Sequence, residues 1–114
     1  MTHEFYFPFP PSVNSLYEGG SKQKRFNSER YKKWLKCAPE LPDYNFKHVE
    51  ITYYLYFPDK RRRDSKNFLK AIDDWMVKQG LIEDDDFNCL THETIVPMGV
   101  HPNGAGIRVV IKEC

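Results

Sequence analysis

The chain has 114 residues, of which 40% are hydrophobic, and its formal net charge is +1. This length and apolar content predict a single domain over residues 1–114. The charge excludes the overall basic excess that is typical of non-specific nucleic-acid-binding proteins, so any argument for such a partner must rest on local charge.

Cysteine spacing and hydropathy indicate the compartment. Cys37, Cys89 and Cys114 are widely spaced and form no C-x-x-C pair, which fits a reducing environment better than a zinc or redox site. No segment approaches the roughly 20 apolar residues of a membrane span, and the first residues do not resemble a signal peptide. We therefore expect a cytoplasmic protein.

The first third of the chain predicts a strand, a loop and a helix. Residues 4–9 alternate in the manner of an edge-prone strand, and prolines follow them. Residues 18–27 contain two glycines and three basic residues, which favours an exposed flexible loop. Ser28 is a suitable N-cap for a short helix through Cys37, in which Tyr31, Trp34 and Leu35 share one face.

The central part predicts the two most regular elements. Residues 49–57 are β-branched and aromatic, as in a strand. Residues 64–79 predict a helix that ends before Gly80, a suitable C-cap glycine. At helical spacing the polar side carries Lys66, Asn67, Lys70, Asp73 and Asp74, and the apolar side carries Phe68, Leu69, Ile72, Trp75 and Met76.

Two further strands are expected near 89–96 and 106–112, joined by a loop over 97–105. The predicted order is strand, helix, strand, helix, strand, strand. This order favours an α+β domain with a mixed sheet that is covered mainly on one face.

Residues 58–67 hold the densest local charge, because five basic residues surround a carboxylate where a strand passes into a helix. Helix N-termini attract anions, and arginine binds phosphate oxygens with two hydrogen bonds. Asn67 and Lys70 extend the same surface along the helix. A phosphodiester is a suitable ligand here.

An acidic run over 83–86 follows the helix. Mg²⁺ is held by a few carboxylates, water molecules and substrate phosphates, so acids from separate elements suffice if the fold brings them together. Asp64 and Asp85 are more than about 20 Å apart measured along the helix. The loop must fold back, as a strand pairing beside residues 49–57 would allow.

Each feature also has a purely structural interpretation. Asp64 or Ser65 can serve as the helix N-cap, and Lys70 can pair with Asp73 or Asp74. The basic and acidic runs can be solvated surface. No histidine has the spacing of a metal ligand pair.

In three places the sequence resembles the RusA family of Holliday junction resolvases. Residues 10–17 are similar to the Pro-Pro-Ser-x-Asn-x-x-Tyr signature, residues 58–70 to the basic catalytic segment, and residues 80–85 to the glycine, two apolar residues and paired acids. The resemblance covers nearly the whole chain in the same order.

This resemblance implies a homodimeric endonuclease, of phage or prophage origin, that cuts four-way DNA junctions symmetrically during recombination and repair. It implies Mg²⁺, with Mn²⁺ as a substitute. Asp64 and Asp85 correspond to the catalytic metal-binding carboxylates, with Asp84 beside them, and Lys70 to the catalytic lysine. The DNA-contacting residues implied are Asn14, Tyr17, Lys60, Arg61, Arg62, Arg63, Lys66 and Asn67.

The sequence departs from the family pattern at Lys66, where the family usually has aspartate. This ammonium should disfavour a cation nearby. Either Asp84 or Asp86 supplies the missing ligand, or Lys66 contacts phosphate instead. Two alternatives therefore stay open: a branched-DNA-binding protein with little or no nuclease activity, and a small protein-interaction domain.

Overall fold

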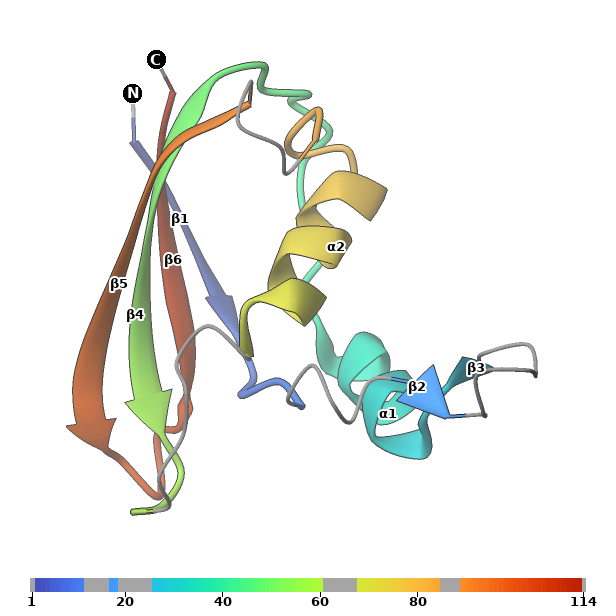
Figure 1. Cartoon of the computed structure of the whole chain (residues 1–114), viewed down its shortest axis with the longest axis vertical. Helices are drawn as coiled ribbons and strands as arrows, with labels where there is room; N and C mark the ends of the chain where they lie inside the picture. Colours follow the sequence, from blue (N-terminus) through green and yellow to red (C-terminus); the bar gives the residue numbers. More distant parts are fainter. Residues whose placement is uncertain (1, 12–16, 19–25, 61–67, 85–88, 114) are drawn as a thin grey trace.

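A four-stranded mixed sheet forms the centre of the protein (Figure 1). The strands lie in the order β1 (Thr2–Phe7), β6 (Gly106–Glu113), β4 (Val49–Phe57) and β5 (Leu90–Val100). β6 runs antiparallel to both of its neighbours, whereas β4 and β5 are parallel. This computed structural model describes residues 2–11, 17–18, 26–60, 68–84 and 89–113.

The two helices lie on the same side of the sheet (Figure 1). Helix α2 (Lys70–Lys78) belongs to the connection between the parallel strands β4 and β5, which needs a long crossover. Helix α1 (Glu29–Cys37) lies near the end of β1. The α+β class, with a mixed sheet covered on one face, is confirmed.

The core lies between the sheet and α2. Alternate side chains of β4 are fully buried, and Ile107, Val109 and Ile111 of β6 continue this surface. Ile72 and Met76 of α2 pack against it and are also fully buried. Removing such side chains from water contributes roughly 1.5–3 kcal/mol each. The predicted apolar side of this helix is confirmed.

Helix α1 begins as its sequence predicts. The Ser28 side chain accepts a 3.1 Å hydrogen bond from the backbone N–H of Tyr31, which satisfies one of the free donors at the helix start. Trp34 donates through Nε1 to the carbonyl oxygen of Pro8 at 2.8 Å and stacks against Phe7. These contacts attach α1 to the end of β1.

Helix α2 ends at a glycine, again as predicted. Gly80 has a φ of 79°, which few side chains tolerate. Its N–H donates to the carbonyl of Val77, and the Leu81 N–H donates to that of Met76, the pair of bonds that defines a Schellman cap. A Cβ atom on Gly80 would lie 2.4 Å from Oδ1 of Asp43. The chain therefore turns back abruptly after α2.

The predicted bounds of two strands were wrong. β1 ends at Phe7, directly before the first proline, and β5 continues to Val100 instead of ending near residue 96. β5 accommodates Pro97 because it is an edge strand, where one side of the backbone needs no hydrogen-bond partner. The loop that was predicted over 97–105 is correspondingly shorter.

The prediction of a flexible loop over 18–27 was also wrong at both ends of that range, where the chain forms strands. β2 (Tyr17–Glu18) pairs with β3 (Phe26–Asn27) in a separate antiparallel ladder. Residues 19–25 lie outside the described part of the chain. Within the ranges given above, no helix has the length and apolar character needed to cross a membrane.

Candidate functional site

Four of the candidate residues lie in the described part of the chain: Tyr17, Lys60, Lys70 and Asp84. The other candidates lie outside it, so their roles remain predictions; they are Asn14, Arg61, Arg62, Arg63, Asp64, Lys66, Asn67 and Asp85. Tyr17 belongs to β2. Lys60 is exposed, three residues after the end of β4.

Lys70 is the first residue of α2, and its side chain is 46% exposed. Its Nζ lies 3.4 Å from Oδ2 of Asp74, one helical turn further on. An exposed pair of this kind contributes at most about 0.5 kcal/mol, so it restrains the ammonium only weakly. Of the two pairings that were possible from the sequence, the structure has the one with Asp74.

The start of α2 differs from the prediction. Its N-cap position is occupied by Leu69, which makes no side-chain capping bond. The interpretation of Asp64 or Ser65 as the helix N-cap concerns residues outside the described part of the chain. The predicted helical residues 64–67 lie outside the described ranges. Because α2 begins at Lys70, that lysine stands in the first helical turn, whose N–H groups have no partners within the helix itself.

Asp73 is turned toward the sheet. Its Oδ1 accepts a 2.5 Å hydrogen bond from the hydroxyl of Tyr53 in β4. Burial raises the pKa of Tyr53 well above 10.0, and the nearby carboxylates of Asp73 and Glu93 raise it further. Tyr53 is therefore a protonated donor that joins β4 to α2. Its acceptor, Asp73, lies three residues after Lys70. Helical spacing places Asp73 on the polar side of the predicted helix, and no sequence pattern indicates its bond to Tyr53.

The acidic run begins in a solvated turn. Glu83 lies 3.3 Å from Nζ of Lys47, and both side chains are more than half exposed. Asp84 is exposed as well. A short bridge between Phe46 and Ile82 fixes the backbone just before these acids. The carboxylate of Asp84 is thus accessible from solvent at a defined place in the fold.

The sheet register places Asp84 far from Lys60. Strand β5 does pair beside β4, as anticipated, but the pairing is parallel. Leu90 therefore lies beside Val49, and Val100 beside Phe57, so the chain enters β5 at the end of β4 that is opposite to Lys60. The two ends of β4 are about 26 Å apart, from the usual rise per residue of a strand.

Among the residues that the structure describes, no group of three or more His, Cys, Asp or Glu side chains could hold a metal ion. The histidines make other contacts: His3 packs on Tyr44 and Phe46, and Nδ1 of His92 lies 3.4 Å from the carboxylate of Glu50. Of the two cysteines in these ranges, neither Cys37 nor Cys89 is in a disulfide, and Cys89 donates through Sγ to the carbonyl oxygen of Phe46 at 3.3 Å.

One comparison bears on the chain as a whole. The sequence is 29% identical over 90 residues to the crossover junction endodeoxyribonuclease rusA of Enterobacteria phage HK97, and the match covers 74% of each chain. No protein family model matches the chain. The similarity thus extends well beyond a single motif.

Proposed function

We propose that this protein is a metal-dependent endonuclease that resolves Holliday junctions and other branched DNA. The observation that carries the proposal is the similarity over 90 residues to a crossover junction endodeoxyribonuclease. The local charge placement is compatible with it. The described end of β4 leads through Lys60 directly into the basic residues that follow.

In this proposal the basic segment binds the phosphates of the junction. The contacts come from Lys60, Arg61, Arg62, Arg63, Lys66 and Asn67, with Asn14 and Tyr17 from the N-terminal signature. Phosphate contacts position a protein on DNA without selecting sequence, which suits an enzyme that recognises a branched shape. A two-fold symmetric substrate also suits a homodimer with an isologous interface.

The proposed metal is Mg²⁺, with Mn²⁺ as a substitute, held by Asp64, Asp85 and Asp84. Hard cations prefer carboxylate oxygens, and the Asp84 carboxylate is exposed. Because the sheet register places Asp84 near the end of β4 that is opposite to Lys60, this site requires the chain between Lys60 and α2 to bring Asp64 toward the acidic run. When bound, the metal would lower the pKa of a water molecule and stabilise charge on the phosphate.

Lys70 is the proposed catalytic lysine near the cleaved phosphate. Its half-exposed ammonium pairs with Asp74, and an exposed pair of this kind is weak enough for the ammonium to turn to a phosphate oxygen and stabilise the negative charge that develops there. The hydrogen bond from Tyr53 to Asp73 holds the backbone of this first helical turn against the sheet. Tyr53 and Asp73 are thus positioning residues.

A second candidate function is favoured by Lys66, which stands where the family usually has a metal-binding aspartate. An ammonium there favours phosphate over a divalent cation. Branched-DNA binding with weak or no cleavage is therefore the alternative. A protein-interaction domain is the third possibility, and failure to bind branched DNA would favour it.

The proposal is tested with a synthetic four-way junction and a linear duplex of the same sequence, each incubated with Mg²⁺ or with EDTA. We expect the protein to cleave the junction and not the linear duplex, and to do so in Mg²⁺ and not in EDTA. Asp64→Asn, Asp85→Asn and Lys70→Gln should each abolish or strongly reduce cleavage while junction binding in EDTA persists. Glu40→Gln, an exposed acid outside the site, is the matched control and should cleave normally. Normal cleavage by all three site variants would refute the assignment.

A further inference from the structure

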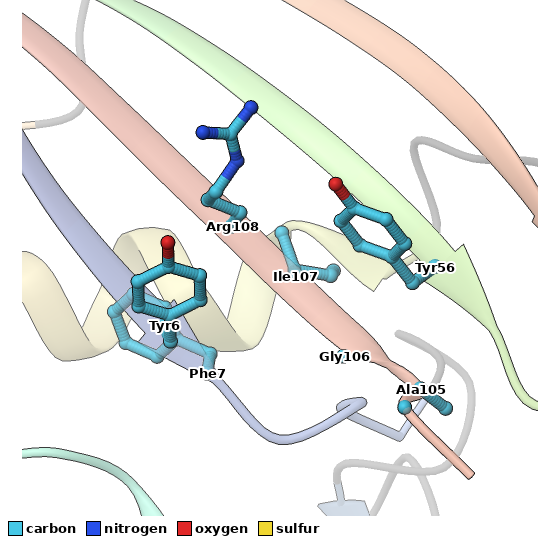
Figure 2. Close-up of a pocket in the computed structure, with 8 residues that line it drawn as sticks. Tyr6, Phe7, Tyr56, Ala105, Gly106, Ile107 and Arg108 are labelled. Carbon is cyan, nitrogen blue, oxygen red and sulfur yellow. The ribbon is translucent and has the colours of Figure 1, made fainter. Parts of the chain in front are cut away.

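The face of the sheet that points away from the helices carries an aromatic hollow. Tyr6 of β1, Tyr54 and Tyr56 of β4, and Arg108 of β6 alternate with the buried core positions of their strands. In the register, Arg108 lies between Tyr6 and Tyr54, and Gly106 lies beside Tyr56. A hollow of about 410 Å³ lies here, with Tyr6 and Tyr56 on either side of β6 (Figure 2).

The walls of this hollow are held in place before any ligand arrives. The hydroxyl of Tyr6 donates to Oε1 of Glu4 at 2.8 Å, and Nη1 of Arg108 donates to the same oxygen at 2.7 Å. The guanidinium carbon of Arg108 lies 4.3 Å from the ring centre of Tyr54. Such fixed side chains reduce the entropy that is lost on binding.

The opposite wall is supported separately. The ring of Tyr56 meets that of His101 edge-on, with their centres 5.1 Å apart, and Nε2 of His101 lies 2.8 Å from the carbonyl oxygen of Met98. Tyr56 is therefore supported by the residues that connect β5 to β6.

Small residues leave the space between the walls open. Gly104, Ala105 and Gly106 line it, and a Cβ atom on Gly106 would lie 2.6 Å from the carbonyl oxygen of Phe7, too close for any side chain. Tyr6 is 67% exposed, the largest exposed fraction among the bulky apolar residues of the described chain. The hollow thus presents an aromatic ring to solvent beside an empty space of ligand size, within the roughly 300–1,000 Å³ of small-molecule sites.

Arg108 supplies hydrogen-bond donors at one wall. Arginine has five N–H donors, and its Nη1 group is engaged by Glu4. Its Nε is buried and has no hydrogen-bond partner among the described residues. The Arg108 side chain is 30% exposed, so the outer N–H donors of its guanidinium group can reach a ligand that brings an acceptor.

We propose that this hollow binds an unpaired nucleobase of the DNA, stacked on Tyr6 and Tyr56, with Arg108 donating to an acceptor on the base edge or on its phosphate. The inference rests on the proposed function and adds a subsite to it. Every base has a π-face, so aromatic side chains bind bases with little sequence preference. All four bases carry acceptors that an arginine can reach.

The position of the hollow favours nucleic acid as its occupant. Tyr56 is the last residue but one of β4, and the basic segment begins directly after that strand. A strand of DNA whose phosphates contact Lys60 and the arginines that follow would pass close to Tyr56. Unpaired bases at a branch point are the easiest to unstack, because the cost is smallest for bases that lack a regular partner.

The test uses two metal-free four-way junctions, one fully paired and one with a single unpaired 2-aminopurine at the branch point. We expect the wild-type protein to bind the second junction more tightly and to quench its fluorescence. Tyr6→Ala and Tyr56→Ala should each lose about 5- to 100-fold in affinity for it, from the usual effect of one stacked base. Tyr6→Phe and Tyr56→Phe should retain the quenching, because they keep the rings.

Tyr44→Ala is the matched control, since Tyr44 is 52% exposed and does not line the hollow. Equal behaviour of Tyr6→Ala and Tyr44→Ala, in a protein that binds junctions, would overturn this subsite and leave the proposed function intact. Absence of any junction binding by the wild type would overturn both. Light scattering completes the test, because it measures whether Tyr6→Ala converts a dimer to a monomer. If it does, and if the affinity for both junctions falls equally, this face binds a second copy of the chain and the subsite is refuted.

Discussion

The hydroxyl of Tyr53 in β4 donates a 2.5 Å hydrogen bond to Oδ1 of Asp73 in α2. This bond joins the centre of the sheet to the first turn of the helix that begins at Lys70. The side chain of Tyr53 is fully buried, and its pKa lies well above 10.0 because burial disfavours the phenolate, as do the nearby carboxylates. Stability should therefore depend on this residue in a pH-dependent way.

Tyr53→Phe should destabilise the fold by about 1–3 kcal/mol near neutral pH, the usual effect of losing a buried hydrogen bond to a charged group. The raised pKa makes the wild-type fold lose stability as the pH rises above about 10, because tyrosine then ionises in the unfolded chain first. The variant should lose less stability over that range. Urea unfolding between pH 7 and 11 measures both effects, with Tyr44→Phe as a control. Parallel pH profiles for wild type and variant would contradict this account.

Gly80→Ala should destabilise the fold by about 1–2 kcal/mol through its left-handed backbone alone, and by more through the contact with Asp43. Two glycines separate these effects. Gly99 has a φ of 84° but nothing within 4 Å of an added Cβ, and Gly104 has neither constraint. Thermal unfolding should rank the variants Gly80→Ala, Gly99→Ala and Gly104→Ala, from least to most stable. A Gly80→Ala protein as stable as Gly104→Ala would show that the Schellman cap is not required.

Much of this local structure could be predicted from sequence, because it depends on neighbouring residues. Ser28 caps α1 and Gly80 ends α2 for reasons that are visible within a few positions, and the composition of β4 predicts its bounds. The passage of β5 through Pro97 could not be predicted, because it depends on which strand lies at the sheet edge.

The candidate site depends more on tertiary structure. Because β4 and β5 are parallel, Asp84 lies near the start of β4, far from Lys60 at its other end. No local sequence pattern contains that information. The bond between Tyr53 and Asp73 joins residues 20 positions apart. The hollow beside Arg108 requires three strands to meet, although the alternation of polar and apolar residues in β6 is a signal that its face is exposed.

Lys60→Ala should weaken junction binding and lower the slope of log affinity against log salt by about one unit, as expected when one phosphate contact is lost. Arg62→Ala should have the same two effects, weaker junction binding and a lower salt slope. Lys32→Ala, an exposed lysine of α1, should leave the slope unchanged. The measurement is the junction affinity of each variant at several salt concentrations between low and physiological salt, from which the slopes are compared. If only Lys32→Ala lowered the slope, the DNA surface would lie along α1 instead.

Lys66→Asp should tighten Mg²⁺ or Mn²⁺ binding and increase cleavage at low metal concentration, while it weakens metal-free junction binding. The reason is that an ammonium beside the carboxylates repels a cation and attracts a phosphate. Titration of metal against cleavage compares the two proteins, and cleavage by the variant alone would favour the DNA-binding alternative for the wild type. Identical metal dependence would show that residue 66 does not sense the metal.

Resolution of a junction has a product pattern that other nuclease activities lack. Four-way junctions labelled in turn on each strand, incubated with the protein and Mg²⁺, report every cleavage position at nucleotide resolution. The account predicts paired cuts at symmetric positions in two opposing strands, yielding nicked duplexes that ligase can seal, and no cuts with Asp64→Asn or Asp85→Asn. Unpaired cuts scattered over all four arms, or equal cutting of linear duplex, would contradict it.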